Sequence, residues 1–174
     1  MKRTLAGLFL LFVPSLSIAQ NPTTTASPTR DQVLAAAKTV IQNARFATLV
    51  TLDESGAPQA RIVDPFAPDS QFTIWVGTNP LTRKVAQIAS NPRVVMLWFQ
   101  APIAYVSLSG RAELVRDSVQ KDKHWKPEWA GLYRNANHGG DYMLIRVIPT
   151  HMEVVGPGMP SDPKTWRPVT IDFP

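Results

Sequence analysis

The sequence contains no cysteine. This absence excludes disulfide bonds, thiolate catalysis, cysteine-ligated zinc and iron–sulfur clusters. The chain also has no HExxH pair, no GxSxG elbow and no glycine-rich phosphate loop, which argues against the zincin, α/β-hydrolase, Rossmann and P-loop classes. The three histidines, His124, His138 and His151, stand at no metal-ligand spacing. We therefore predict no metal site.

Charged residues are also scarce, at 18% of the chain, and the formal net charge is +5. No run of lysine and arginine is dense enough to indicate nucleic-acid binding. By contrast, 44% of the 174 residues are hydrophobic, which is enough for one globular domain with its own core. The 16 prolines, nearly twice the usual share of about 5%, favour many short elements joined by turns.

Residues 1–19 have the three-part pattern of a secretory signal peptide. Lys2 and Arg3 precede an apolar run, which ends at the small residues of segment 17–19. The run is too short to span a membrane, which takes about 20 residues. We therefore predict an exported protein, periplasmic or secreted, with no membrane span after cleavage; the alternative is an uncleaved N-terminal anchor. Without Lys2 and Arg3 the chain has 16 basic and 13 acidic residues, a net charge of +3.

The mature chain is expected to contain three parts. They are a flexible polar linker, a folded domain and an irregular proline-rich tail, at 20–28, 29–156 and 157–174. Thr29 and Gln32 form a capping-box pattern at the start of the domain, and apolar residues follow at helical spacing, which predicts a helix over 29–43. Within the tail, 169–171 is the one candidate for a short strand.

After this helix the apolar residues mostly recur at every second position, which indicates strands. The predicted strands are 45–52, 59–66, 72–77, 93–99, 104–115 and 142–155, with helices at 81–90 and 117–129, the second of them broken at Pro127. Their hairpin order implies antiparallel pairing, and curling into a barrel would leave the fewest exposed edges. The predicted fold class is mainly β: a six-stranded antiparallel β-barrel with peripheral helices.

Three details of these strands are also predicted. Segment 93–99 is almost unbroken in apolar residues, so we expect it to be buried on both faces. Gly110 is expected to form a bulge or bend in its strand, and Pro149 is expected to kink the last long one.

The densest group of chemically useful side chains lies at 78–84, where a strand is predicted to end and a helix to begin. The free amides and positive dipole end of a helix start suit an anion. Thr82 adds a hydroxyl donor, Arg83 a planar fork that grips phosphate oxygens, and Lys84 a compact charge. The segment predicts a phosphate site; the alternative is a solvated cationic helix face.

Arg61 strengthens the phosphate interpretation. It stands in the middle of a predicted strand, between Ala60 and Ile62, where a charge needs a partner. A phosphate held between Arg61 and the start of the 81–90 helix would provide one. The alternative is an arginine that faces solvent on an alternating strand.

Four segments of the chain resemble a known family between about residues 45 and 155. They are FATLVTLDESGAPQARIV, FTIWVGTNPLTRKVAQIASNPRVVMLWF, YVSLSGRAELV and GGDYMLIRVIPTHMEVV. The second is the most specific, because it joins a strand, T-N-x-x-[ST]-R-K, a helix and N-P-R-V. The sequence resembles the pyridoxamine 5'-phosphate oxidase-like proteins, an FMN-binding split-barrel superfamily, and within it the general stress protein subgroup.

This resemblance implies a split barrel that forms a homodimer, with FMN at the subunit interface. By position, Arg61 would reach the FMN phosphate, and the backbone of Ile62 and Val63 would face the flavin ring. The cofactor-binding residues implied are Arg61, Ile62, Val63, Thr78, Thr82, Arg83 and Lys84.

The chain also departs from the vitamin-processing oxidases of this superfamily. Tyr105 stands where they have a glutamine, Phe66 stands where they have a lysine, and the tail has no R-x-H motif. The subgroup's aromatic residue near the end of the last strand is replaced around Val154 and Val155. Oxidation of pyridoxamine phosphate is therefore not supported, and no catalytic residue is assigned.

The function expected from the sequence is an exported FMN-binding protein, a flavin-dependent oxidoreductase of unknown substrate. One alternative is a non-catalytic binding module for a flavin, a haem or another planar anion, with His124, His138 and His151 as candidate axial ligands. Another is a deazaflavin-dependent reductase. Because the chain has no twin arginine, it would be exported unfolded, and FMN would be acquired outside.

Overall fold

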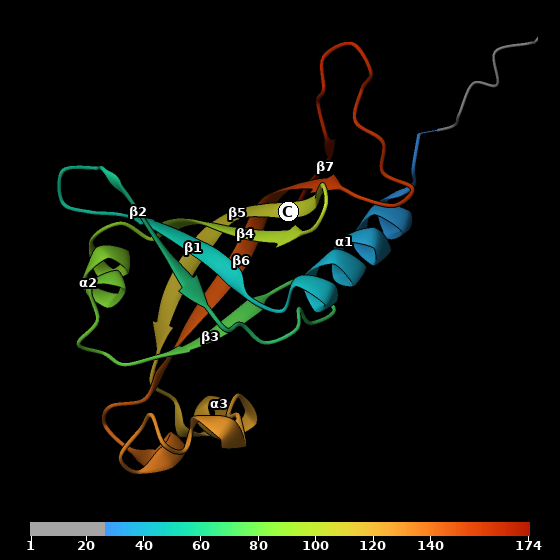
Figure 1. The fold of residues 1–174 in the computed structure, drawn as a ribbon. Coiled ribbons are helices and arrows are strands. Elements are labelled where there is room, and N and C mark those ends of the chain that lie inside the picture. The colour runs from blue at the N-terminus through green and yellow to red at the C-terminus, as the bar shows by residue number, and fades with distance from the viewer. Residues whose placement is uncertain (1–26) are drawn as a thin grey trace, which may run out of the picture.

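The computed structural model describes residues 27–174, and the predicted signal peptide and most of the linker lie outside them. The described chain forms a seven-stranded antiparallel sheet in the order β2-β1-β4-β5-β6-β3, with β7 paired to β6 (Figure 1). The strands are β1 (Ala47–Leu52), β2 (Pro58–Val63), β3 (Ile74–Thr78), β4 (Arg93–Gln100), β5 (Ala104–Val115), β6 (Met143–Val155) and β7 (Val169–Asp172). The helices are α1 (Arg30–Ala44), α2 (Arg83–Ser90) and α3 (Ser118–Lys123), with 3₁₀ turns at Pro127–Trp129 and Ala136–His138.

The segment that follows β2 meets β3, the strand at the other end of the sheet, at one point. An isolated bridge joins Pro65 to Val76, and the amide of Phe66 donates to the carbonyl of Trp75 at 2.9 Å. Elsewhere these two edges are not paired with each other. The predicted antiparallel, mainly β split barrel is confirmed, with the sheet left open between β2 and β3 rather than closed.

The predicted start of the domain is confirmed in detail. Thr29 caps α1, its hydroxyl accepting from the amide of Gln32 while the Gln32 side chain accepts from the amide of Thr29. The apolar face of α1 packs against β4 and β5 and is fully buried there. None of the helices in residues 27–174 is long and apolar enough to cross a membrane.

The prediction that the strand at 93–99 is buried on both faces is wrong. Side chains of β4 alternate, so Val94, Met96 and Trp98 lie in the core while Leu97 and Phe99 are exposed. The apolar run reflects the fact that both faces of β4 are apolar. The folded chain covers only one of these faces.

The end of the chain contributes more to the sheet than an irregular tail would. The candidate strand at 169–171 is confirmed as β7, which pairs with the second half of β6 on the same edge where β3 pairs with the first half. Ile171 is buried in the main core. The predicted bulge at Gly110 is also confirmed, by a register shift between β5 and β6 at that residue.

A second, aromatic core lies beneath α3 and the first 3₁₀ turn. Its buried members are Trp75, Trp129, Tyr142 and Leu144, with Phe66, Trp125 and Tyr133 packed at its sides. His124 belongs to this layer, because its ring stacks on Trp75 with centroids 4.2 Å apart. Its Nδ1 lies 3.0 Å from the carbonyl oxygen of Gln120.

The buried position of His124 should make the fold sensitive to acid. Burial lowers the pKa of the imidazole from its ordinary 6.5, against the opposing effect of the Gln120 carbonyl. Below about pH 6.5 the unfolded chain then binds a proton more readily, so stability should fall as the pH drops from there towards the folded-state pKa. Urea midpoints measured across this range should decline in the native protein and stay flatter in His124→Gln. An unchanged slope in that variant, or the same flattening in the exposed control His138→Gln, would contradict this assignment.

Candidate functional site

Helix α2 begins directly after β3 ends, as the sequence predicted, and the connection is rich in hydroxyl groups. Thr82 is the N-cap residue, but its hydroxyl does not cap the helix; it donates to the carbonyl of Asn79 at 2.8 Å. The hydroxyls of Thr78 and Thr82 lie 3.2 Å apart. The start of α2 therefore has no side-chain cap, and the hydroxyl groups of Thr78 and Thr82 lie next to it.

Two basic side chains, one from α2 itself and one from β2, are held by hydrogen bonds beside this helix. Lys84 folds back along the connection, and its Nζ donates to the hydroxyl of Thr78 at 3.0 Å. Arg61 reaches across from β2, and its guanidinium donates to the hydroxyl of Thr51 at 2.7 Å and to the side-chain carbonyl of Gln87 at 2.9 Å. Since Gln87 belongs to α2, the structure brings Arg61 alongside the helix that carries Arg83 and Lys84.

These three cations have no acidic partner among residues 27–174: no carboxylate lies within 4.0 Å of Arg61, Arg83 or Lys84. Burial and then the charge of Arg83 lower the pKa of Arg61, and burial and then the charge of Arg61 lower the pKa of Lys84. The three cations therefore repel one another, and an anion placed among them would relieve this repulsion.

One pocket of about 330 Å³ lies on the Lys84 side of α2. We call it the Thr78 pocket. Five of the seven predicted site residues line it, namely Ile62, Val63, Thr78, Thr82 and Lys84. Its opposite wall consists of Trp129, Leu132 and Tyr133, which sequence analysis did not assign to the site. The regular spacing of Trp125, Trp129 and Tyr133 was the only signal for this wall, and it equally fitted a purely structural core.

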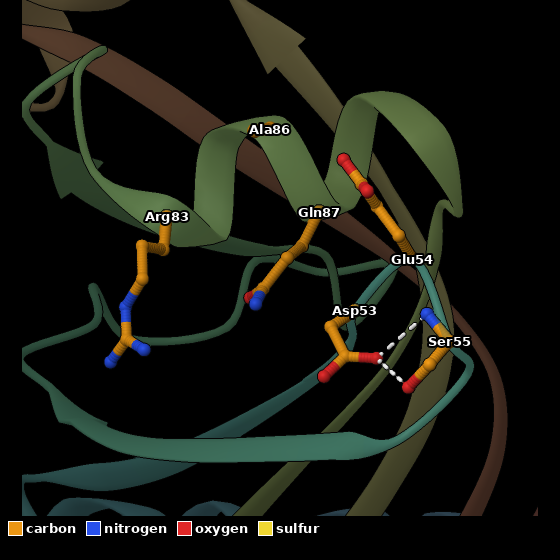
Figure 2. A pocket seen from close by; sticks show the side chains of 6 residues that line it. All are labelled: Asp53, Glu54, Ser55, Arg83, Ala86 and Gln87. Carbon is orange, nitrogen blue, oxygen red and sulfur yellow. Dashed lines mark hydrogen bonds between the residues drawn. The ribbon is translucent and has the colours of Figure 1, made fainter.

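A second pocket, of about 440 Å³, is lined in part by other residues of α2 (Figure 2). We call it the Arg83 pocket, and it is lined by Asp53, Glu54, Ser55, Arg83, Ala86 and Gln87. Arg83 and Gln87 extend from the same side of α2, and Gln87 lies nearer than Arg83 to the β1–β2 turn, which carries the three other polar residues. Of the other two predicted site residues, Arg83 thus lines this second pocket and Arg61 lines neither of the two.

Gly77 allows the aromatic wall to approach β3. A Cβ atom at this position would run into the ring of Trp129 and would come within 2.9 Å of Tyr142. Gly77→Ala should therefore force both rings to move and lower the free energy of unfolding by about 1–3 kcal/mol, measured by urea denaturation. The matched control is Gly131→Ala, where an added Cβ meets nothing within 4 Å. Equal stability of the two variants would contradict the close packing.

The three histidines do not converge. His124 is buried in the aromatic core, whereas His138 lies 3.6 Å from Asp122 and His151 lies 2.7 Å from Asp172. None of them lines the Thr78 pocket. Among residues 27–174, no group of three or more histidine, aspartate or glutamate side chains is arranged to hold a metal ion.

Comparison with known proteins relates this arrangement to one family. The family model described as pyridoxamine 5'-phosphate oxidase matches residues 33–156. The fold is similar to general stress protein 26 from Bacillus anthracis, with 21% identity over 80% of this chain and 97% of that one and a TM-score of 0.66. It is also similar to a general stress protein 26-related protein from Clostridium acetobutylicum, with 16% identity over 83% and 96% of the two chains and a TM-score of 0.69.

A third solved structure with this fold is a heme binding protein from Mycobacterium smegmatis. It shares 17% identity over 83% of this chain and 60% of that one, with a TM-score of 0.61. No curated protein sequence matches the chain. At these identities the solved structures establish the shared fold, while the family model covers the segment from α1 to the end of β6.

Proposed function

Since the chain belongs to the pyridoxamine 5'-phosphate oxidase family, we propose that it binds FMN at the Thr78 pocket and serves as a flavin-dependent oxidoreductase. The observation that carries this proposal is the cluster of three cations without a carboxylate partner among residues 27–174, beside a pocket of about 330 Å³ that one of the three, Lys84, lines.

The cation cluster suits the phosphate end of FMN. Arg61 and Arg83 offer guanidinium forks and Lys84 a point charge, and charge-assisted hydrogen bonds from such groups are among the strongest that proteins make. The hydroxyls of Thr78 and Thr82 add short-range donors beside Lys84. A dianion would relieve the mutual repulsion that the free protein retains.

The Thr78 pocket suits the ring end. Small-molecule sites commonly have volumes of about 300–1,000 Å³, and this pocket has about 330 Å³ and combines apolar side chains with polar ones, including Asp64 and Asn79. The β2 residues Ile62 and Val63 line one wall, while Trp129 and Tyr133 line the other. The aromatic rings provide flat apolar surface against which a flavin ring can pack.

A bound flavin would supply hydride or electron transfer, and the protein would supply binding, orientation and electrostatics. We propose that the substrate is not pyridoxamine phosphate. Phe66, which stands where the resemblance expects a lysine, packs edge-on against Trp129 in the aromatic core with centroids 5.6 Å apart. The nearest cation, Lys126, lies 5.0 Å from the Phe66 ring centre and is paired with Asp64 at 2.7 Å, so it is not free to hold a substrate phosphate.

We further propose a homodimer formed through the outer face of the sheet. Ile62, Leu97 and Phe99 are exposed there by 68%, 38% and 60%, and Ile103, in the turn between β4 and β5, is exposed by 67%. Thr48 of β1 pairs with both Ile62 and Leu97, so these side chains follow one row across β2, β1 and β4. Large apolar patches of this kind mark interfaces. Because Ile62 also lines the Thr78 pocket, such an interface would border the ligand site.

Export is part of the proposal and rests on the sequence pattern of residues 1–19. A periplasmic or secreted protein that crosses the membrane unfolded would take up its flavin after folding. Protein isolated from the exported fraction should therefore start at residue 20 and carry a yellow chromophore, which mass spectrometry and absorption spectroscopy can test together.

The direct test is a titration of the mature protein with FMN and with riboflavin, followed by quenching of flavin fluorescence. FMN should bind more tightly than riboflavin by at least about 1,000-fold, because only FMN carries the phosphate that the three cations would hold. Equal affinities would show that the cation cluster takes no part, and no binding of either flavin would overturn the proposal.

Haem is the second candidate, on the strength of the structural neighbour named as a heme binding protein. The histidines that would serve as axial ligands lie apart from the Thr78 pocket, which is why we place flavin first. Titration with haemin distinguishes the two, because a histidine-ligated haem gives an intense absorption band that is lost when the ligating histidine is replaced. A deazaflavin, compared with FMN in the same titration, tests the third alternative.

A further inference from the structure

We propose that the outer face of the sheet carries a second small-molecule site, which binds a carboxylate attached to an apolar body. The site is a third pocket, of about 450 Å³, lined by residues of β1, β4, β5 and β6. We call it the Arg93 pocket. It shares no lining residue with the Thr78 pocket or the Arg83 pocket. It is also apart from the exposed ring of Phe99, which lies about 20 Å further along β4 than Arg93 at about 3.3 Å per residue.

The Arg93 pocket lies on the face of the sheet that Arg61 does not occupy. Val50 and Leu52 line the pocket from β1. Thr51, between them, is fully buried, and its hydroxyl accepts a hydrogen bond from Arg61. Since successive side chains of a strand point to opposite faces, the sheet separates this pocket from Arg61. The inference is therefore independent of the proposed flavin site.

Two arginines of the pocket stand directly opposite each other. Arg93 of β4 and Arg111 of β5 are cross-strand partners, and both are exposed. Like charges in such positions destabilise a sheet. No carboxylate among residues 27–174 lies within 4.0 Å of either guanidinium. Glu113, two positions after Arg111 on β5, is bonded to Arg146 at 3.0 Å. A bound anion would relieve the repulsion between the two arginines.

Most of the donor groups of these two arginines are available to a ligand. The Nε–H group of Arg93 donates to the side-chain oxygen of Asn91 at 3.2 Å, and its terminal nitrogens donate to no described residue. Within residues 27–174, the guanidinium of Arg111 likewise donates to no other residue. Two guanidinium forks side by side match the paired oxygens of a carboxylate.

A β-bulge adds hydroxyl groups to the same pocket. Ser109 pairs with His151 of β6, while the next residue, Gly110, pairs with Pro149. Thr150 is therefore the extra residue of β6 and has no partner in β5. Ser109 and Thr150 both line the pocket, and among the described residues the Ser109 hydroxyl forms no hydrogen bond. Bulges commonly redirect a side chain towards a site in this way.

The rest of the pocket surface is apolar. Val50 of β1 and Val95 of β4 are half-buried cross-strand partners, and Leu52 lies beyond Val50 on the same face. Ser109 stands opposite Val95, so the apolar surface reaches the hydroxyl groups of the bulge. Inorganic phosphate would contact only the arginines and leave the aliphatic side chains uncovered. A carboxylate with an apolar body would use both, and about 450 Å³ lies within the usual range for small-molecule sites.

The first test titrates the mature protein with phenylbutyrate by isothermal titration calorimetry. We expect a Kd below about 1 mM. The neutral phenylbutyramide lacks the charge and acetate lacks the apolar body, so each should bind at least about 10-fold more weakly. No binding of phenylbutyrate would overturn the proposal. Equal binding of phenylbutyramide would do so as well, because the arginines would then take no part, and so would equal binding of acetate or inorganic phosphate.

Variants then test the two arginines. Arg93→Gln and Arg111→Gln should each weaken phenylbutyrate binding about 10-fold. The matched control, Arg116→Gln, removes an exposed arginine just after β5 that does not line the pocket, and it should bind phenylbutyrate normally. If Arg111→Gln alters the oligomeric state of the protein and leaves phenylbutyrate binding unchanged, the arginines serve a subunit contact and the site is refuted.

Competition with flavin separates this proposal from the proposed function. FMN should not displace phenylbutyrate, because the two pockets lie apart. Displacement by FMN would refute a separate site. Binding of phenylbutyrate without any binding of FMN would support the Arg93 pocket and overturn the flavin proposal, and the reverse result would do the opposite.

Discussion

Replacement of Arg61 by glutamine should lower the affinity for FMN about 100-fold, which corresponds to about 2.7 kcal/mol. The guanidinium contributes two things that glutamine lacks: a permanent charge and a fork of donors. Charge-assisted hydrogen bonds contribute about 1.5–3 kcal/mol each when they are lost in a partly buried setting. Because Arg61 is drawn towards α2 by Gln87 and not by an acid, its charge remains available to the ligand.

The readout that separates phosphate binding from general damage is riboflavin. Arg61→Gln should leave the riboflavin affinity within a factor of about two of the native value, because riboflavin has no phosphate for the cation to hold. FMN should also raise the melting temperature of the native protein more than that of the variant, since a tighter ligand stabilises the folded state more at equal concentration.

Two further variants serve as controls for this comparison. Arg61→Lys keeps the charge without the fork and should retain part of the FMN affinity. Arg93→Gln removes an exposed arginine on β4 that lines neither of the two pockets at α2 and should bind FMN as the native protein does. A loss of FMN affinity in Arg93→Gln, or a normal affinity in Arg61→Gln, would refute the assignment of the phosphate site.

The second large effect is expected at the outer face of the sheet. Phe99→Glu should convert a dimer of the native protein into a monomer, measured by light scattering on a sizing column. Phe99 is exposed on β4 in the single chain, as are Leu97 of the same strand and Ile62 across the sheet. Burying a carboxylate in such an apolar interface without a partner costs far more than the interface gains from one ring.

The matched control for Phe99→Glu is Val119→Glu, because Val119 is an equally exposed apolar residue on α3, away from the patch. It should leave the dimer intact. If the ligand site borders the interface, the monomeric Phe99→Glu should also bind FMN more weakly, although Phe99 lines neither of the two pockets at α2. A native protein that is monomeric, or a Phe99→Glu variant that remains dimeric, would contradict the proposed interface.

Local features of the fold could be predicted because the signals for them lie close together in the chain. Thr29 and Gln32 are three residues apart, so the capping box of α1 was visible before any tertiary contact was known. Hairpin order predicted antiparallel pairs, and Gly110 predicted the bulge in β5. The start of α2 beside Thr82, Arg83 and Lys84 was visible for the same reason.

Other features could not be predicted, since they depend on which surfaces meet. The apolar run of β4 has the composition of a strand buried on both faces, and only the folded sheet shows that its outer face is left uncovered. The aromatic wall of the Thr78 pocket comes from Trp129 and Tyr133, about 50 residues after β3. Their spacing fits a core equally well, and Trp129 in fact belongs to both.

The sequence by itself determined the classes of chemistry that are absent, the antiparallel strand order and the cationic start of α2, because each depends on residue type or on near neighbours. Only the tertiary structure decided that Arg61 meets this helix through Gln87 and that no carboxylate among the described residues neutralises the cluster. It also decided that Arg83 and Lys84, adjacent in the chain, line different pockets. The physical reason is that consecutive residues of a helix point about 100° apart, so what each one faces depends on the strands and turns packed around that helix.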